Sequence, residues 1–184
     1  MMHHPFRLGL FSLLMILTAC ASLPPQLMSE QQSVISDYTE WSKRPANAHE
    51  EVRLGGVIAQ ITNLTDSTRI EIVNLPLDQS GRPNLAHEPQ GRFVGYVDGF
   101  LDPVTYGPGR LISMIGTTAA SEQGNVGEYD YHFPVMKVKG YYLWRVEERI
   151  IIDDIGPYLF PCGHFHCRSI DDYPRRGRVI QEVK

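Results

Sequence analysis

Two cysteines and two histidines lie close together in the stretch FPCGHFHCRS, near the C-terminus. They are Cys162, His164, His166 and Cys167. Thiolate sulfur and imidazole nitrogen are the ligands that zinc and copper prefer in proteins. Two histidines that are two residues apart also point to the same side of an extended chain. The cluster therefore predicts a zinc or copper site, although its spacing is not a standard four-ligand zinc pattern.

The same two cysteines also fit a disulfide bond. Gly163 lets the chain bend back between Cys162 and Cys167, and an oxidising compartment favours their pairing. The chain has three cysteines, and if Cys20 is modified, as argued below, two thiols are left to pair. The disulfide, the metal site and a pair of free thiols are the three alternatives at this stage.

Cys20 follows an apolar segment at the N-terminus. Residues 1–19, MMHHPFRLGLFSLLMILTA, carry one firm charge, at Arg7, and residues 8–19 are uncharged. A helix that spans a membrane needs about 20 apolar residues, and this run is shorter before it meets SLPPQ. The segment is therefore predicted to be a signal peptide for secretion and not a permanent anchor.

The residues Leu17-Thr18-Ala19-Cys20 resemble the lipobox of bacterial lipoproteins. The resemblance implies that Cys20 becomes the first mature residue, with a diacylglyceryl thioether on its sulfur and an acylated amine, and that it incorporates palmitate. A thiolate suits this reaction because it is a strong side-chain nucleophile. The alternative is a secreted protein that is cleaved near Ala19 or Ala21, in which Cys20 has no special role.

The residues after Cys20 indicate which membrane the lipid enters. The resemblance to Gram-negative lipoproteins implies that an aspartate just after the cysteine would signal retention in the inner membrane. This chain has Ala21 and Ser22 after Cys20 instead. We therefore expect a lipid anchor in the outer membrane, with the protein on the periplasmic face. More than one acyl chain holds a domain stably at a membrane without a spanning segment.

The composition fits one domain of ordinary size. The chain has 184 residues, 42% of them hydrophobic, and 21 acidic against 17 basic residues. A chain of this length buries a core without needing disulfides. The mild acidic excess argues against a nucleic-acid partner, since nucleic-acid binding usually needs a basic face.

Residues 20–49 combine a proline pair with a polar middle, which is typical of a lipidated tether. Within this segment Val34, Tyr38 and Trp41 have helical spacing. They predict either one short amphipathic helix that caps the domain or an irregular tether.

Residues 50–146 are predicted to be a β domain, because their apolar runs are short and are separated by turn residues. Ile70 and Ile72 alternate with polar neighbours, as in a half-buried strand. In the last run, one face is expected to hold Met136, Val138, Tyr142 and Trp144. The expected strands are VRLGGVIAQIT, TRIEIVNLPL, RFVGYVDGFL, GRLISMIGTTA and HFPVMKVKGYYLWRVE.

These runs indicate a mainly β fold, a small antiparallel barrel of five to six strands that is OB-like. Closure hides the sheet edges, and glycines inside the runs suit the bends and bulges that closure needs. Residues 147–184 are expected to be a C-terminal extension, which adds a strand to the barrel and then continues as an irregular tail.

The ordered set of motifs is similar to the Slp (starvation-inducible) outer-membrane lipoprotein family over about residues 20–144. The resemblance implies an envelope lipoprotein associated with starvation or stationary phase, and it supplies no catalytic residues. The Cys/His cluster lies beyond this region. The motifs are Gly55-Gly56 after VRL, PLDQSGRP, GRF, FLDPVTYGPGR, TTAASEQGNVGEYDY and HFPVMKV with GYYLW.

The sequence thus predicts a protein that is not an enzyme, with a structural or interaction role in the cell envelope. Its expected partners are outer-membrane lipid, through acylated Cys20, and an envelope protein; no cofactor is expected beyond the covalent lipid. The alternative is a periplasmic lipoprotein that binds a small ligand or a metal, zinc or copper.

Overall fold

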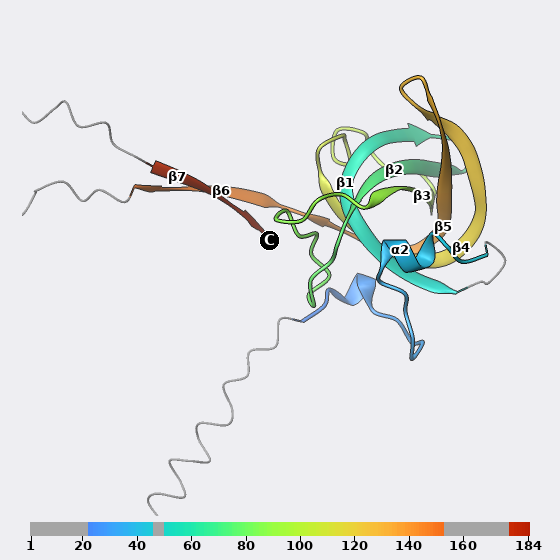
Figure 1. The fold of residues 1–184 in the computed structure, drawn as a ribbon, viewed down its shortest axis with the longest axis horizontal. Coiled ribbons are helices and arrows are strands. Elements are labelled where there is room, and N and C mark those ends of the chain that lie inside the picture. Colours follow the sequence, from blue (N-terminus) through green and yellow to red (C-terminus); the bar gives the residue numbers. More distant parts are fainter. Residues whose placement is uncertain (1–21, 46–49, 153–176) are drawn as a thin grey trace, which may run out of the picture.

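The structure, a computed structural model, describes residues 22–45, 50–152 and 177–184. Strands dominate it, and β4 and β5 together form one long hairpin (Figure 1). In chain order the elements are η2 (Pro25–Leu27), α2 (Tyr38–Trp41), β1 (Glu51–Asn63), β2 (Ser67–Leu75), β3 (Gly91–Asp98), β4 (Leu111–Val126), β5 (Tyr129–Trp144), β6 (Val146–Ile152) and β7 (Gly177–Val183).

The first five strands close into a barrel in the order β1-β2-β3-β5-β4, with β4 paired back to β1. In the barrel, β5 lies between β3 and β4, which are consecutive in the chain. The connection from β3 to β4 therefore crosses past β5, which gives the Greek-key connectivity of OB-type barrels. Four of these pairings are antiparallel, and the pairing of β3 with β5 is parallel. The predicted mainly β, OB-like barrel is confirmed, and the parallel pair is the one exception to its expected antiparallel pairing.

Alternate residues of the strands fill the barrel interior. Ile70 and Ile72 are fully buried there, whereas Glu71, which lies between them in sequence, is on the outer face and pairs with Arg92. Removing such side chains from water is the main favourable term in folding. The interior cluster contains Val52, Leu54, Ile58, Ile70, Ile72, Phe93, Val97, Leu101, Ile112, Met114, Met136 and Val138.

A β-bulge in β5 changes which of its residues face the interior. The register of β5 against β4 skips Lys139, so this residue is an extra one. One extra residue reverses the alternation of the strand. Met136 and Val138 consequently belong to the interior cluster, but Tyr142 and Trp144 belong to a separate cluster. The prediction that these four side chains share one face is wrong for this reason.

The separate cluster lies on the outside of the barrel, and we call it the outer cluster. Trp144 is 4% exposed in it, and its Nε1 donates a hydrogen bond to Ser113 Oγ at 2.9 Å. Leu27 of the N-terminal segment is fully buried against the same strands. The outer cluster consists of Leu27, Leu75, Leu111, Ile115 and Trp144, with Leu23, Val34, Val57, Tyr142 and Val183 packed at its margin.

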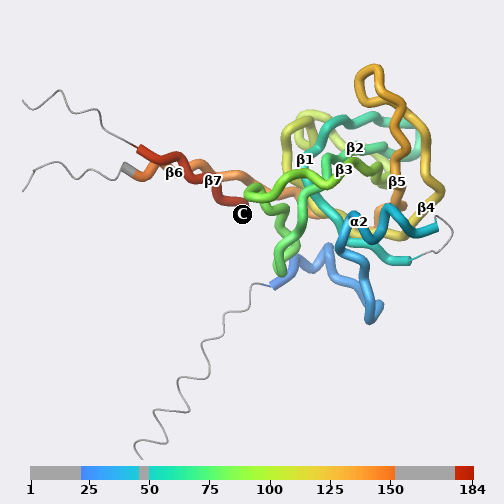
Figure 2. Tube along the Cα trace, in the orientation of Figure 1, coloured from blue at the N-terminus to red at the C-terminus, as the bar shows by residue number. Residues whose placement is uncertain are grey.

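Within residues 22–45 the N-terminal segment is part of the folded domain. Figure 2 shows it running along the barrel, and Ile35 forms a parallel bridge with Val52. Arg53 on β1 donates from Nε to the Leu27 carbonyl at 2.8 Å. The part of the expected tether that the structure describes is therefore held against the barrel.

The helix α2 closes one end of the barrel. Trp41 is 2% exposed, and its ring meets that of Phe93 edge to face, with the centroids 5.9 Å apart. Its Nε1 donates to Thr118 Oγ1 at 3.0 Å. Of the two alternatives for this segment, the structure contains the short capping helix, over Tyr38–Trp41, and Val34 lies before it.

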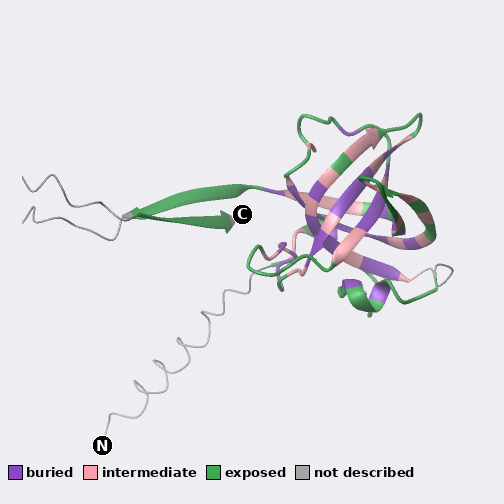
Figure 3. Ribbon diagram, turned by 45° about the horizontal axis from the view of Figure 1, so that its top comes forward, coloured by how far each residue is buried: buried purple, intermediate pink, exposed green. Residues whose placement is uncertain are grey.

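The strands β6 and β7 form a two-stranded antiparallel sheet that projects from the barrel (Figures 1 and 3). We call this sheet, together with the paired Arg145 and Lys184, the ribbon. Among the described residues β6 pairs with β7 and with no barrel strand. The expectation that the C-terminal extension adds a strand to the barrel is therefore wrong, and its described part is regular instead of irregular.

Replacement of Trp144 by alanine should lower the free energy of unfolding by about 3–5 kcal/mol, because it empties the centre of the outer cluster and leaves Ser113 without its donor. Urea denaturation measures this change. Tyr129→Ala, at a position that is 72% exposed, is the control and should change stability by less than about 0.5 kcal/mol. Similar values for the two variants would contradict the central position of Trp144.

Candidate functional site

The residues that the sequence singles out for chemistry lie outside the described part of the structure. The structure therefore neither brings them together nor separates them, and the lipid attachment, the disulfide and the metal site stay predictions. In the described ranges, no group of three or more His, Cys, Asp and Glu side chains is placed to hold a metal ion. The residues concerned are Cys20, Cys162, His164, His166 and Cys167.

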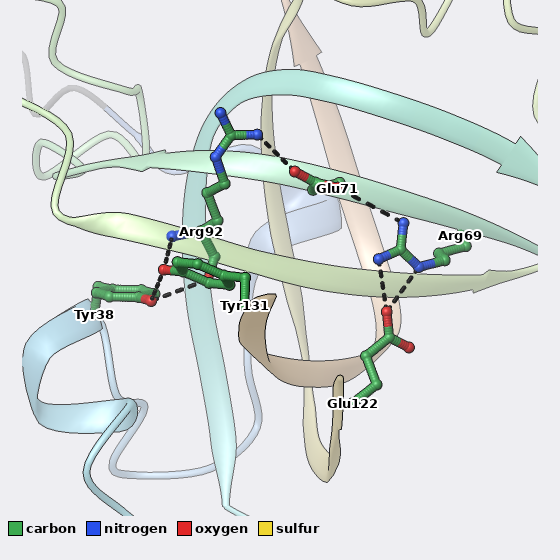
Figure 4. A network of polar contacts seen from close by, with 6 residues as sticks. All are labelled: Tyr38, Arg69, Glu71, Arg92, Glu122 and Tyr131. Atoms are coloured by element: carbon green, nitrogen blue, oxygen red, sulfur yellow. Dashed lines mark hydrogen bonds and ion pairs between the residues drawn. The ribbon is translucent and has the colours of Figure 1, made fainter. Parts of the chain in front are cut away.

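A network of charged and phenolic side chains covers the outer face of β2 and β3 (Figure 4). Arg69 on β2 donates from Nε to Glu122 Oε1 at 2.8 Å, and Tyr96 on β3 donates to the other oxygen of Glu122 at 2.6 Å. Arg92 on β3 donates from Nη1 to Glu71 Oε1 at 2.6 Å. Each of these two arginines is thus neutralised by a carboxylate of the same domain.

The hairpin of β4 and β5 folds over this face. Phe133 and Val135 of the hairpin are buried against Val94 of β3. The guanidinium carbon of Arg69 lies 5.5 Å from the centroid of the Phe133 ring, within cation–π range. In OB-type barrels strands 2 and 3 and the adjoining loops bind ligands. Here the hairpin of the same chain occupies that face.

A tyrosine pair joins the capping helix to the hairpin. Tyr38 on α2 donates from its hydroxyl to the Arg92 carbonyl at 2.9 Å, and the Arg92 amide donates to the Tyr131 hydroxyl at 3.1 Å. The two hydroxyl oxygens are 3.5 Å apart. Burial, together with the hydrogen bond to Tyr131, raises the pKa of Tyr38 above its ordinary value. Tyr38 therefore stays protonated at neutral pH and acts as a structural donor.

A second polar group fastens the N-terminal segment to the barrel. Glu51 on β1 is 6% exposed and accepts a hydrogen bond from Ser29 Oγ. Its Oε1 also forms an ion pair with Lys139 Nζ, at 3.0 Å. Burial acts to raise the pKa of Glu51, but the hydrogen bonds from Ser29 and Lys139 and the nearby positive charges outweigh it and lower the pKa. We call these three residues the clasp.

Sequence reasoning missed the clasp. In the sequence, Lys137 and Lys139 simply alternate with apolar residues of a strand. The role of Lys139 becomes visible in the structure, where it is the bulged residue and forms an ion pair with Glu51. A local signal exists in the next residue, Gly140, where a Cβ atom would lie 2.1 Å from the carbonyl oxygen of Gln26. The glycine at this position is needed because the N-terminal segment crosses β5 in close contact.

The chain matches one family model and several known proteins over most of its length. A model of the outer membrane lipoprotein Slp family matches residues 17–173. The chain is 31% identical over 180 residues to the protein described as uncharacterized lipoprotein YeaY of Escherichia coli (strain K12), which covers 94% of this chain and 92% of YeaY. It is 28% identical over 141 residues to outer membrane protein Slp of the same organism, covering 76% and 74% of the two chains.

A further relative is described as an uncharacterized protein of Haemophilus influenzae (strain ATCC 51907 / DSM 11121 / KW20 / Rd); it is 34% identical over 132 residues, 71% of each chain. No solved structure matches the chain. No helix in residues 22–45, 50–152 or 177–184 is long and apolar enough to cross a membrane.

These findings define the class of protein, an outer-membrane lipoprotein of the cell envelope. Within that class the chain belongs to the Slp family. The family match reaches residue 173, further than the motifs that end near residue 144. The expectation that the Cys/His cluster lies beyond the family region is therefore wrong.

Replacement of Lys139 by glutamine should raise the pKa of Glu51. A carboxyl group with a lower pKa in the folded state adds stability above its unfolded pKa, and loses it as the pH falls through the folded pKa. We therefore expect Lys139→Gln to lower the free energy of unfolding by about 0.2–1 kcal/mol at pH 7, and the difference from wild type to shrink on acidification. Urea denaturation at a series of pH values measures it. Lys137→Gln, on the same strand, should show no such pH dependence; equal behaviour of both variants would contradict the clasp.

If the domain faces the oxidising periplasm, the protein purified from the envelope without reductant should have Cys162 and Cys167 joined. Alkylation of the unfolded protein, followed by mass spectrometry, should then modify neither thiol until a reductant is added. The metal site would instead be established if both thiols are modified without reductant and the protein contains stoichiometric zinc or copper. The bound metal should then be lost in His164→Ala and His166→Ala.

Proposed function

We propose that this chain is a non-catalytic lipoprotein that acyl chains on Cys20 hold at the periplasmic face of the outer membrane. Its barrel would support the envelope, or contact another envelope component, under starvation or stationary-phase stress. The observation that carries the proposal is the packing of the chain onto the barrel directly after Cys20. Ala21 alone separates Cys20 from Ser22, and Leu23 already packs on the outer cluster.

This spacing leaves little slack between lipid and fold. A fully extended chain spans at most about 3.6 Å per residue, so the Cα of Cys20 lies within about 7 Å of that of Ser22. Leu27 is fully buried a few residues later. The acyl chains would therefore hold the outer cluster at the lipid surface, which suits a protein that acts at the membrane.

The polar network supports a role without catalysis. A general acid or base works best with a pKa near the operating pH. Burial raises the pKa of Tyr38, and burial together with the hydrogen bond to Glu122 raises the pKa of Tyr96. The hydrogen bonds from Ser29 and Lys139 lower the pKa of Glu51. Each shift moves the group away from neutrality and strengthens its ordinary protonation state.

The covered face also supports a role without nucleic acid. Arg69 and Arg92, which would otherwise give β2 and β3 a basic surface, are paired with Glu122 and Glu71. Phosphate binding would first have to break these pairs and lift the hairpin from Val94. The starvation or stationary-phase setting rests on the resemblance to starvation-inducible Slp proteins.

Replacement of Cys20 by alanine in the full-length protein should abolish incorporation of labelled palmitate in cells, because the thiol that forms the thioether is gone. A precursor that retains residues 1–19 should accumulate. Cys162→Ala and Cys167→Ala are the matched controls and should be labelled like wild type. Normal labelling of Cys20→Ala, or a mature start at any later residue, would contradict the assignment.

The same cells test the side of the membrane. With a periplasmic barrel, added protease should leave the wild-type protein intact in whole cells and degrade it once the outer membrane is permeabilised. Degradation in whole cells would place the barrel on the outside. Crosslinking in stationary-phase cells tests the interaction role, which predicts one defined envelope protein as the product.

A further inference from the structure

The ribbon is amphipathic. In an antiparallel pair, residues directly opposite each other lie on the same face. One face holds the cross-strand pairs Val146–Val183, Glu148–Gln181 and Ile150–Val179, and we call it the apolar face. The other face holds Arg145–Lys184, Glu147–Glu182, Arg149–Ile180 and Ile151–Arg178.

The outer part of the apolar face lies open in the described structure. Ile150 is 70% exposed and Val179 is 61% exposed, although they are direct cross-strand partners. The hydrophobic effect favours their removal from water. A two-stranded ribbon on its own is also marginally stable in water. Both facts favour a surface that covers Ile150 and Val179.

The apolar face starts at the side of the barrel from which the N-terminal segment begins. Val183, the partner of Val146 at the base of the ribbon, packs at the margin of the outer cluster. Leu23 packs at the margin of the same cluster. Because Leu23 follows Cys20 so closely in sequence, lipid attached to Cys20 lies on the side of the molecule that carries the base of the apolar face.

We propose that the apolar face of the ribbon is a second membrane contact, which lies on the bilayer that holds the acyl chains. This inference rests on the proposed attachment of lipid to Cys20. The anchor brings the bilayer surface within reach of the ribbon, and the apolar face continues from the outer cluster beside the anchor. The bilayer is therefore the surface to which both features point.

The chemistry of the ribbon sets the depth of the contact. A two-stranded sheet has edges with unpaired backbone groups, which are not tolerated in the hydrocarbon core. Its other face carries ion pairs, Lys184 with Glu147 and Arg149 with Glu182. The ribbon therefore lies in the interface, with Ile150 and Val179 toward the acyl chains and the ion pairs toward water. With two points of contact, the membrane fixes the orientation of the barrel.

Depth-dependent quenching of tryptophan tests the contact. The full-length acylated protein is reconstituted in vesicles of phosphatidylethanolamine and phosphatidylglycerol with brominated acyl chains. The variants Val179→Trp and Ile180→Trp add a tryptophan to neighbouring positions on opposite faces, and the signal of Trp41 and Trp144 is subtracted with wild type. We expect the tryptophan added by Val179→Trp to be quenched at least about twofold more than that added by Ile180→Trp. Equal quenching would overturn the proposal.

Two further measurements keep the outcome decisive. Ile150→Trp, at the cross-strand partner of Val179, should be quenched like Val179→Trp, and it replaces that variant if the latter unfolds. A dimer that crosslinks through the ribbon, with no excess quenching, would identify a second copy of the chain as the occupant and would overturn the membrane contact.

The test separates this inference from the proposed function. Wild-type protein that incorporates palmitate and floats with the vesicles, but shows equal quenching of the two variants, would remove the ribbon contact and leave the lipid anchor intact. Protein without palmitate would remove the anchor, and with it the premise of the inference.

Discussion

The bulge at Lys139 is the constraint on which the attachment of the N-terminal segment depends. The extra residue turns Trp144 outward, where it packs in one cluster with Leu27. Lys139 itself forms an ion pair with Glu51, and the neighbouring Gly140 leaves room for the chain to cross β5. Without the bulge, the indole of Trp144 would point into an interior that is already filled. The segment after Cys20 would then lose the packing of Trp144 in the cluster that buries Leu27.

The barrel combines an OB-like arrangement with a face that is already occupied. The long hairpin of β4 and β5 lies on β2 and β3, where its Glu122 pairs with Arg69, while Arg92 pairs with Glu71 of β2 (Figure 4). Among the described residues, the large hydrophobic side chains that are exposed lie in the ribbon, in loops and, with Tyr129, at the tip of the hairpin. This distribution is consistent with the proposed role of the chain, a member of the Slp family, at the membrane surface.

The sequence predicts those features that repeat along the chain. The alternation around Ile70 and Ile72 predicts a strand, because burial repeats with the period of the backbone. The spacing of Tyr38 and Trp41 allows the capping helix, but it leaves an irregular tether as an equal alternative. The bulge is a single insertion into such a pattern, so a regular alternation conceals it.

The pair of Arg69 with Glu122 joins residues far apart in the chain, and β7 is far in sequence from its partner β6. Such long-range contacts depend on the closed fold. Cys20 and the Cys/His cluster are evident from the sequence. They lie outside the described residues, so the structure does not test the predicted lipid attachment, disulfide or metal site.

The burial of Leu27 so soon after Cys20 has a mechanical consequence. A long, loose linker absorbs small displacements of its attachment point, whereas a short one transmits them. If Cys20 is acylated as proposed, a pull on it would load Leu23 and Leu27 first and then β1, through the hydrogen bond from Arg53 to the Leu27 carbonyl. Tension or curvature in the membrane would in this way reach the barrel wall as force.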